Sequence, residues 1–198
     1  INVEEKPTGE ISAGAGLGSS CGSLGFSVKE NNYLGKGHKL KSSLNISKST
    51  IRGAFDLTVP NFRYSDKALT SSISSTASDN LTDFGYKSTK TGFSAGTIYE
   101  QYEDIYFSPK LSTYVESIET DTTASKNLKK QEGSYFDINF DYGIDYDKRN
   151  QSFQPSSGFR SSFFQSVPLV SDTYSLSNGY IFTSYHEMLN EMIGSFSI

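Results

Sequence analysis

The sequence predicts an all-β protein, an antiparallel, up-and-down transmembrane β-barrel that is present here as a partial barrel of about eleven strands. Three observations support this prediction. Apolar and polar residues alternate with a period of two along the whole chain. The sequence contains no run of 18 apolar residues, the length that a transmembrane helix needs. Aliphatic residues are sparse, whereas the chain has 13 Tyr, 14 Phe and 17 Gly.

The alternation begins in the first predicted strand. Apolar residues occupy every second position there, namely Ile11, Ala13, Ala15 and Leu17. The positions between them are Glu10, Ser12, Gly14 and Gly16. After a short turn the pattern resumes with Leu24, Phe26 and Val28. A period of two places these two sets on opposite faces of a strand.

The composition excludes several classes of protein. The net charge of -4 gives no reason to expect a nucleic-acid partner. A mean hydropathy of -0.46 is typical of soluble or disordered chains, but the many aromatic residues argue against disorder. Cys21 is the single cysteine and lies in a predicted turn, so no intrachain disulfide is possible. The chain has no signal peptide and begins at Ile1, so we expect a piece of a longer precursor.

The same pattern predicts the strands in order. The ranges are about 9–18, 22–31, 38–48, 51–59, 67–77, 83–97, 104–118, 134–147, 158–167, 173–186 and from about 190 onward. Turn residues separate them, including Gly35 and Gly37 in the second connection and Pro60 after the fourth strand. The stretch 119–132 is predicted to be a polar loop without an amphipathic helix.

The clearest strand is the one predicted over 134–147. Its apolar set is Phe136, Ile138, Phe140, Tyr142, Ile144 and Tyr146. Its other face carries Asp137, Asp141 and Asp145, with Asp147 just beyond. Carboxylates cannot face hydrocarbon, so we expect them to line a hydrated lumen. This interpretation is preferred over a cation site.

A soluble β-sandwich also alternates apolar and polar residues, and it is the alternative architecture. A sandwich fills its core with Leu, Ile, Val and Phe, whereas the apolar face here includes Ser, Gly, Thr and Tyr. Strands of about 10–14 residues are long for a sandwich and match tilted membrane-spanning strands. The membrane barrel is therefore the preferred prediction.

No set of residues indicates a catalyst, a cofactor or a metal site. His38 and His186 lie in different predicted strands, and no cysteine or aspartate stands near them at triad spacing. Gly14, Gly16 and Gly18 do not form a phosphate-binding loop, because no helix follows them. We therefore expect a protein that is not an enzyme.

Four segments together resemble the Omp85 superfamily, and most closely its outer-membrane assembly factors. They are Val3-Glu4-Glu5-Lys6-Pro7-Thr8-Gly9, the glycine-rich run 14–18 continued by 25–37, Leu57-Thr58-Val59-Pro60-Asn61-Phe62, and Tyr146-Asp147 followed by Pro155-Ser156-Ser157-Gly158-Phe159-Arg160. Their order and spacing cover nearly the whole chain.

The resemblance implies a domain division and a location. Residues 1–8 would end the last periplasmic POTRA domain, and residues 9–198 would form the N-terminal portion of the barrel in a Gram-negative outer membrane. This portion corresponds to roughly the first eleven of about sixteen strands. The superfamily's Arg-Gly-Phe loop motif is absent from this sequence; Arg52-Gly53-Ala54 is not that motif.

The resemblance also implies a function, namely insertion and folding of β-barrel proteins through a lateral gate. The gate would be the first strand, with the residues Gly9, Glu10, Ile11, Ser12, Ala13, Gly14, Ala15, Gly16 and Leu17. The implied partners are nascent outer-membrane β-barrel proteins, accessory lipoproteins bound through POTRA domains, and outer-membrane lipid. The alternatives are a two-partner secretion transport pore of the same superfamily and a passive porin.

Simple physics supports a weak first strand. Glycine in a strand interior has no side chain to pack and loses more conformational entropy than other residues. Gly14 and Gly16 should therefore weaken the pairing of this strand. A strand edge with unpaired N–H and C=O groups is a template for another strand. For this chain we expect an open, curved sheet with two exposed edges rather than a closed cylinder.

Overall fold

A computed structural model describes residues 7–17, 22–172, 174–189 and 192–198. Most of the predicted POTRA end (residues 1–6), together with Gly18 and Cys21, lies outside the described residues.

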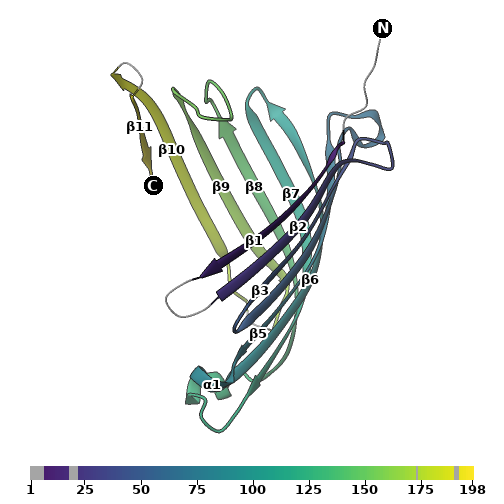
Figure 1. Ribbon diagram of the computed structural model, residues 1–198, viewed down its shortest axis with the longest axis vertical. Helices are drawn as coiled ribbons and strands as arrows, with labels where there is room; N and C mark the ends of the chain where they lie inside the picture. Colours follow the sequence, from purple (N-terminus) through teal and green to yellow (C-terminus); the bar gives the residue numbers. More distant parts are fainter. Residues whose placement is uncertain (1–6, 18–21, 173, 190–191) are drawn as a thin grey trace.

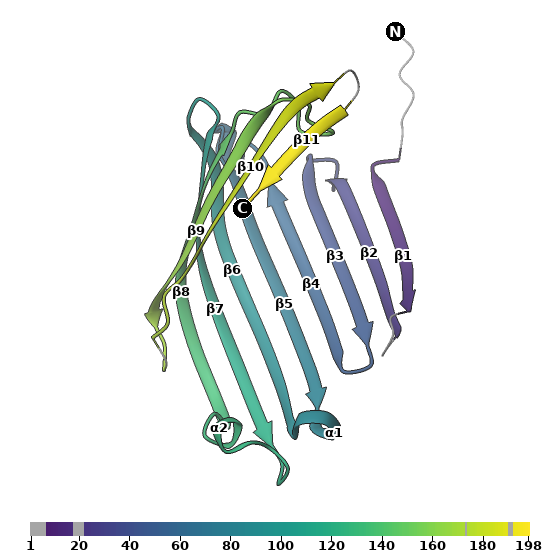
Figure 2. The ribbon, with the colours of Figure 1, turned by 90° about the vertical axis from the view of Figure 1, so that its left-hand side faces the viewer.

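All strands belong to one antiparallel sheet in which each strand pairs with its neighbours in sequence, from β1 to β11 (Figure 1). The strands are β1 Gly9–Leu17, β2 Gly22–Tyr33, β3 His38–Ser47, β4 Thr50–Val59, β5 Ala68–Asn80, β6 Tyr86–Tyr102, β7 Ile105–Thr120, β8 Gly133–Asp147, β9 Gly158–Val170, β10 Ser177–Leu189 and β11 Met192–Ser197. Figure 2 shows that the sheet is curved and leaves β1 and β11 at its two ends. The predicted open partial barrel is confirmed, because the described residues of β1 and β11 do not pair.

Three short helical segments interrupt the connections: η1 Phe62–Tyr64, α1 Leu81–Phe84 and α2 Lys126–Lys129. Two details differ from what the sequence pattern shows. The sixth strand starts at Tyr86 rather than near residue 83, because α1 ends at Gly85 with a φ of 73°. The loop after β7 contains one helical turn, which Ser125 caps by accepting a hydrogen bond from the Leu128 N–H at 3.3 Å.

No helix among the described residues is long and apolar enough to cross a membrane.

The sheet has an outward apolar face and an inward polar face, the reverse of a soluble protein. Among the described residues, Ala124 is the only buried hydrophobic side chain and Ser112 is the only fully buried one. The predicted apolar sets are exposed along the sheet, as with Phe26, Phe93 and Phe136. A sandwich would bury such residues between two sheets. The single sheet therefore excludes that alternative and fits a barrel wall that faces lipid.

Aromatic side chains form a row on the outward face near the rim where β1 begins, which we call the proximal rim. Tyr99 contacts Phe107 with ring centroids 5.8 Å apart, and Tyr142 lies 6.2 Å from both Phe107 and Phe163. Tyr146, Phe159 and Phe182 continue the row. Such girdles mark the membrane–water interface of a barrel.

Aromatic rings cover two glycines on the inward face. A Cβ added to Gly92 would lie 2.4 Å from the Tyr114 ring on the neighbouring strand. A Cβ on Gly179 would lie 2.1 Å from the Phe164 ring. The Lys90 ammonium in turn lies 4.9 Å from the Tyr114 ring centroid. These glycines are thus required by close ring-to-backbone packing.

The loops at the opposite, distal rim dock on each other at Gly85. The Asp121 N–H donates to the Gly85 carbonyl at 2.8 Å. The Asp121 carboxylate accepts hydrogen bonds from the Thr123 hydroxyl at 2.6 Å and from the Thr123 N–H at 2.7 Å. A Cβ on Gly85 would lie 2.5 Å from the Ala124 nitrogen. This contact connects α1 to the loop that follows β7.

Replacement of Gly92 by Val should destabilise the folded barrel by about 1–3 kcal/mol, because the new side chain displaces the Tyr114 ring. Urea unfolding of the natural full-length protein in lipid vesicles measures the change. Gly53→Val is the matched control, since a Cβ at Gly53 meets no atom within 4 Å. Equal unfolding midpoints for the two variants would contradict the packing argument.

The docked distal loop should be stable until strongly acidic pH. The Thr123 hydroxyl, with the Thr123 N–H, lowers the pKa of Asp121 below its ordinary value of 3.8. A lowered folded-state pKa stabilises the loop above the ordinary value, and this stabilisation is lost as pH falls through the lowered pKa. Protection of the Asp121 N–H from hydrogen exchange should therefore persist down to about pH 4 and then decline. Asp121→Asn should remove this pH dependence; an unchanged acid-induced loss in that variant would disprove the assignment.

Candidate functional site

The candidate site is β1, which pairs with β2 on one side only among the described residues. Its register runs from Gly9 opposite Glu30 to Leu17 opposite Gly22. The outward side chain of Ile11 is 83% exposed, whereas its cross-strand neighbour Val28 is 47% exposed. The difference arises because Val28 has strands on both sides and Ile11 has a strand on one.

The first hydrogen bond of β1 shows which of its backbone N–H and C=O groups face β2. The Asn31 N–H donates to the Thr8 carbonyl at 3.2 Å. Residues in an antiparallel ladder alternate between hydrogen-bonded and non-hydrogen-bonded pairs. Thr8, Ser12 and Gly14 therefore direct their backbone groups toward β2. The alternate residues, Ile11 and Ala13 among them, direct N–H and C=O groups toward the outer side of β1.

The centre of the β1–β2 ladder has few side-chain contacts. Gly14 lies opposite Gly25, so no side-chain pair forms at this position. A Cβ on Gly14 would have no atom within 4 Å, and one on Gly16 would meet only the Ser23 hydroxyl at 3.0 Å. Cross-strand side-chain pairs are the main source of sheet stability beyond the backbone. The ladder between β1 and β2 is consequently weak at its centre.

The start of β1 is held differently, by a cluster of polar contacts around Thr8. The Thr8 hydroxyl donates to the Glu30 carboxylate, which also accepts from the Asn32 N–H at 2.8 Å. The Asn31 side-chain amide donates to the Thr8 carbonyl at 3.0 Å. A Cβ on Gly9 would lie 3.0 Å from the Glu30 carboxylate. β1 is therefore clamped at its start and weakly paired further along.

Sequence periodicity did not identify this clamp. Thr8 and Glu30 are 22 residues apart, and their contact depends on the register of the first hairpin. The predicted gate residues Gly9 to Leu17, by contrast, do form one continuous strand, as expected.

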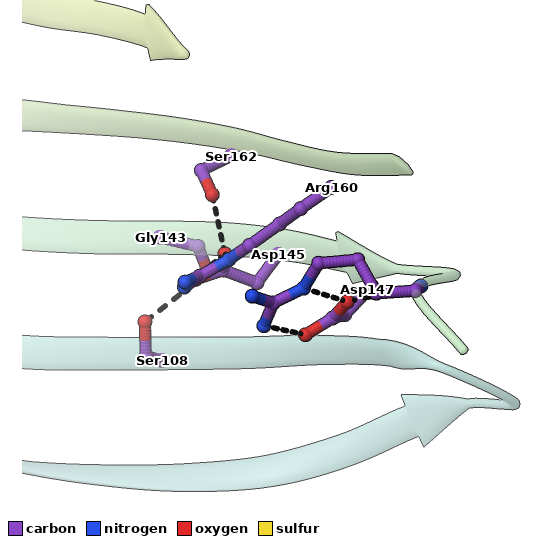
Figure 3. A network of polar contacts seen from close by, with 7 residues as sticks. Ser108, Gly143, Asp145, Asp147, Arg160 and Ser162 are labelled. Atoms are coloured by element: carbon purple, nitrogen blue, oxygen red, sulfur yellow. Dashed lines mark hydrogen bonds and ion pairs between the residues drawn. The ribbon is translucent and has the colours of Figure 1, made fainter. Parts of the chain in front are cut away.

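The predicted aspartate row lies together on the inward face, and each carboxylate has polar partners. Asp141 accepts hydrogen bonds from the Ser112 and Ser166 hydroxyls and lies 3.7 Å from the Lys110 ammonium. Asp145 pairs with Arg160 at 2.8 Å and accepts from the Ser162 hydroxyl (Figure 3). Asp137 accepts a hydrogen bond from Ser171. These contacts join β7, β8 and β9.

The connection after β8 is also well anchored. The Arg149 guanidinium donates to the Asp147 carboxylate through Nε at 2.7 Å and Nη2 at 2.6 Å. The Asp104 carboxylate beside Lys148 raises the pKa of that ammonium above its ordinary value. Gly158 is required where the loop closes, because its φ is 95° and a Cβ would lie 2.1 Å from the Lys148 carbonyl. This end of the sheet is therefore rigidly connected.

The two histidines do not come together. His38 begins β3 and His186 lies near the end of β10. Within the described part of the chain, no group of three or more His, Cys, Asp or Glu residues could hold a metal ion.

A family model for the Omp85 superfamily domain matches residues 32–197. The chain belongs to the Omp85 superfamily. The match covers most of the sheet but begins at the end of β2, so β1 lies outside the matched residues. No curated protein matches the chain significantly.

Among solved structures, the chain is similar to BamA from Haemophilus ducreyi lacking POTRA domains 1–3. The TM-score is 0.75 at 20% sequence identity, and the alignment covers 92% of this chain and 38% of that chain. The Omp85 chain described here thus spans well under half of the BamA chain and shares the fold of part of its barrel. The predicted family and fold class are confirmed.

Removal of the Thr8 hydroxyl should loosen the start of β1. In Thr8→Val, the Glu30 carboxylate loses a donor, and the amides of Glu10 and Ser12 should exchange hydrogen several-fold faster. Exchange mass spectrometry on the natural full-length protein in lipid nanodiscs measures this effect. Thr8→Ser keeps the hydroxyl and is the control. Identical β1 exchange in both variants would rule out the clamp.

Proposed function

We propose that this chain forms the N-terminal part of the barrel of an outer-membrane assembly factor, and that β1 is the strand to which incoming β-barrel proteins add. The observation that carries the proposal is the structure of the β1–β2 pairing. β1 is clamped at Thr8 and has no side-chain pair where Gly14 lies opposite Gly25. A strand held in this way stays attached to β2 at its start, while its outer edge is open to another strand.

The mechanism exchanges one strand pairing for another and needs no side-chain chemistry. Each glycine in a strand costs about 0.5–1 kcal/mol relative to alanine. Gly14 and Gly16 together therefore weaken the ladders of β1 by about 1–2 kcal/mol, a factor of roughly 5–30 in a pairing equilibrium. At the outer edge of β1, an incoming strand that makes better side-chain pairs therefore replaces a strand that pairs weakly there.

The orientation of the backbone N–H and C=O groups of β1 sets which residues of the incoming strand face lipid and which face the lumen. Its hydrogen bonds would form with Ile11, Ala13 and Ala15, whose side chains face outward. Residues of the incoming strand opposite these positions would face lipid, and those opposite Ser12 and Gly14 would face the lumen. The site therefore selects strands with an alternating apolar and polar pattern.

We assign the proximal rim to the periplasmic side of a Gram-negative outer membrane. Residues 1–8 would end the last POTRA domain, and residues 9–198 would belong to the barrel. The aromatic row from Tyr99 to Phe182 supports an interface at this level. Accessory lipoproteins would bind through the POTRA domains, and outer-membrane lipid would contact the outward face.

Gly14→Val should slow insertion of a model barrel protein by roughly two- to five-fold, because valine stabilises the closed pairing by about 0.5–1 kcal/mol. The substitution introduces no clash, since a Cβ at this position has open space. The measurement is the rate at which the natural full-length protein, reconstituted in vesicles, folds an unfolded substrate.

Gly53→Val is the matched control, because its Cβ also meets open space but the residue lies in β4, away from the proposed gate. We expect this variant to insert substrate at the unmodified rate. Equal rates for Gly14→Val and the unmodified protein would remove the argument for a weak first strand.

A further inference from the structure

The inward face of the sheet is divided into two walls of unlike charge. On β2, β3 and β4 the inward positions carry the cations Lys29, Lys39, Lys41 and Arg52, together with the carboxylate of Asp56, as the register of these strands places them on one face. On β8 the inward positions carry Asp137, Asp141 and Asp145, with Asp147 at the end of the strand. We call the four cations on β2, β3 and β4 the basic wall.

The cations of the basic wall differ from the other inward cations in having no carboxylate within ion-pair distance among the described residues. Lys90 pairs with Glu116 at 3.2 Å, Lys110 with Asp141 at 3.7 Å and Arg160 with Asp145 at 2.8 Å. Lys29 and Lys41, by contrast, lie directly opposite each other in the ladder. On their other sides, Lys29 lies opposite Glu10 of β1 and Lys41 lies opposite Asp56 of β4, although neither carboxylate is within ion-pair distance in the described part of the chain. Four cations against these two carboxylates leave the wall with a local excess of positive charge.

Two hollows open on this wall. One, of about 520 Å³, is lined by Gly14, Gly16, Asn45 and Arg52 among others. The other, of about 430 Å³, shares Gly14 and Asn45 and includes Lys41. Because they share lining residues, the hollows form one trough along β1 and β2. Its floor is mostly glycine and serine, so a second chain can approach the backbone closely.

The spacing of the cations along the trough matches an extended chain. Arg52 lies opposite Asn45, which is four residues from Lys41 on β3. The two cations are therefore separated by about 13 Å along the strand direction. An extended peptide places residues i and i+4 on the same face at this distance. A ligand with carboxylates at this spacing can reach both cations at once.

We propose that the basic wall binds an extended, acidic segment of the incoming polypeptide, beside the strand that adds to β1. The inference rests on the proposed function for the identity of the ligand, and on charge complementarity for its chemistry. A small anion would contact one exposed cation and bind weakly. A chain with several carboxylates engages cations along the whole trough, whereas the aspartates on β8 already have cations and hydroxyls as partners.

Binding of two strand peptides to the natural full-length protein in detergent micelles tests the proposal. Both are 12-residue fluorescent peptides with alternating apolar and polar residues; one has Asp at two polar positions four residues apart, and the other has Asn there. Fluorescence anisotropy should show that the Asp peptide binds roughly three- to ten-fold more tightly at low salt. The preference should decline as salt is raised.

Substitutions of the cations test whether the tighter binding of the Asp peptide depends on the basic wall. The double variant Lys41→Gln and Arg52→Gln should abolish the preference for the Asp peptide. Lys48→Gln is the control, because Lys48 is exposed in the distal turn between β3 and β4 and changes the net charge without touching the trough. Equal binding of the two peptides to the unmodified protein, or equal loss of preference in Lys48→Gln, would overturn the proposal.

Failure of this inference is distinguishable from failure of the proposed function. Ser12→Cys, in a background with Cys21→Ser, tests strand addition by disulfide cross-linking to cysteines placed along a substrate strand. Cross-links at β1 without a preference for the Asp peptide would support the gate and contradict binding by the basic wall. A preference for the Asp peptide that depends on Lys41 and Arg52, without cross-links at β1, would support binding by the basic wall and contradict the gate.

Discussion

The whole structure depends on the continuous antiparallel hydrogen-bond ladder from β1 to β11, because the sheet has no apolar core to hold it together. Ser112 is the only fully buried side chain in the described part of the chain, and most of the large apolar residues lie on the outward face. In lipid, every backbone polar group must find a partner within the protein. The ladder supplies these partners, and side chains add to it where they pair across strands.

The ladder is unevenly reinforced. Between β7, β8 and β9, serine hydroxyls and cations bind the inward aspartates, and aromatic rings pack along the outward face. Between β1 and β2, only backbone hydrogen bonds join the strands where Gly14 lies opposite Gly25, and the Thr8 contacts hold the start of the strand. A sheet that is stiff in its middle and weak at its first strand confines opening to that strand.

The inward face shows a second unevenness, in charge. The aspartates of its acidic half have lysine, arginine or serine partners, whereas the four cations at β2–β4 outnumber the neighbouring carboxylates Glu10 and Asp56 and form no ion pair among the described residues. The basic half lies next to the weakly held strand, with the trough between them. Strand pairing and charge therefore distinguish the same side of the lumen, although they depend on different residues.

The strand count, the two faces and the position of the glycines can be predicted from the sequence alone, because a side-chain period of two is a local property. Thus the outward set of β8 and the inward Asp141 and Asp145 were both predictable. The helical turns at Leu81 and Lys126 were missed, because loop conformation depends on contacts such as that of Gly85 with the loop after β7. The pairs of residues that meet across strands, by contrast, are known only from the three-dimensional structure. The Thr8 clamp, the Tyr114 ring over Gly92 and the juxtaposition of Lys29 with Lys41 all depend on register, which relates residues far apart in the chain.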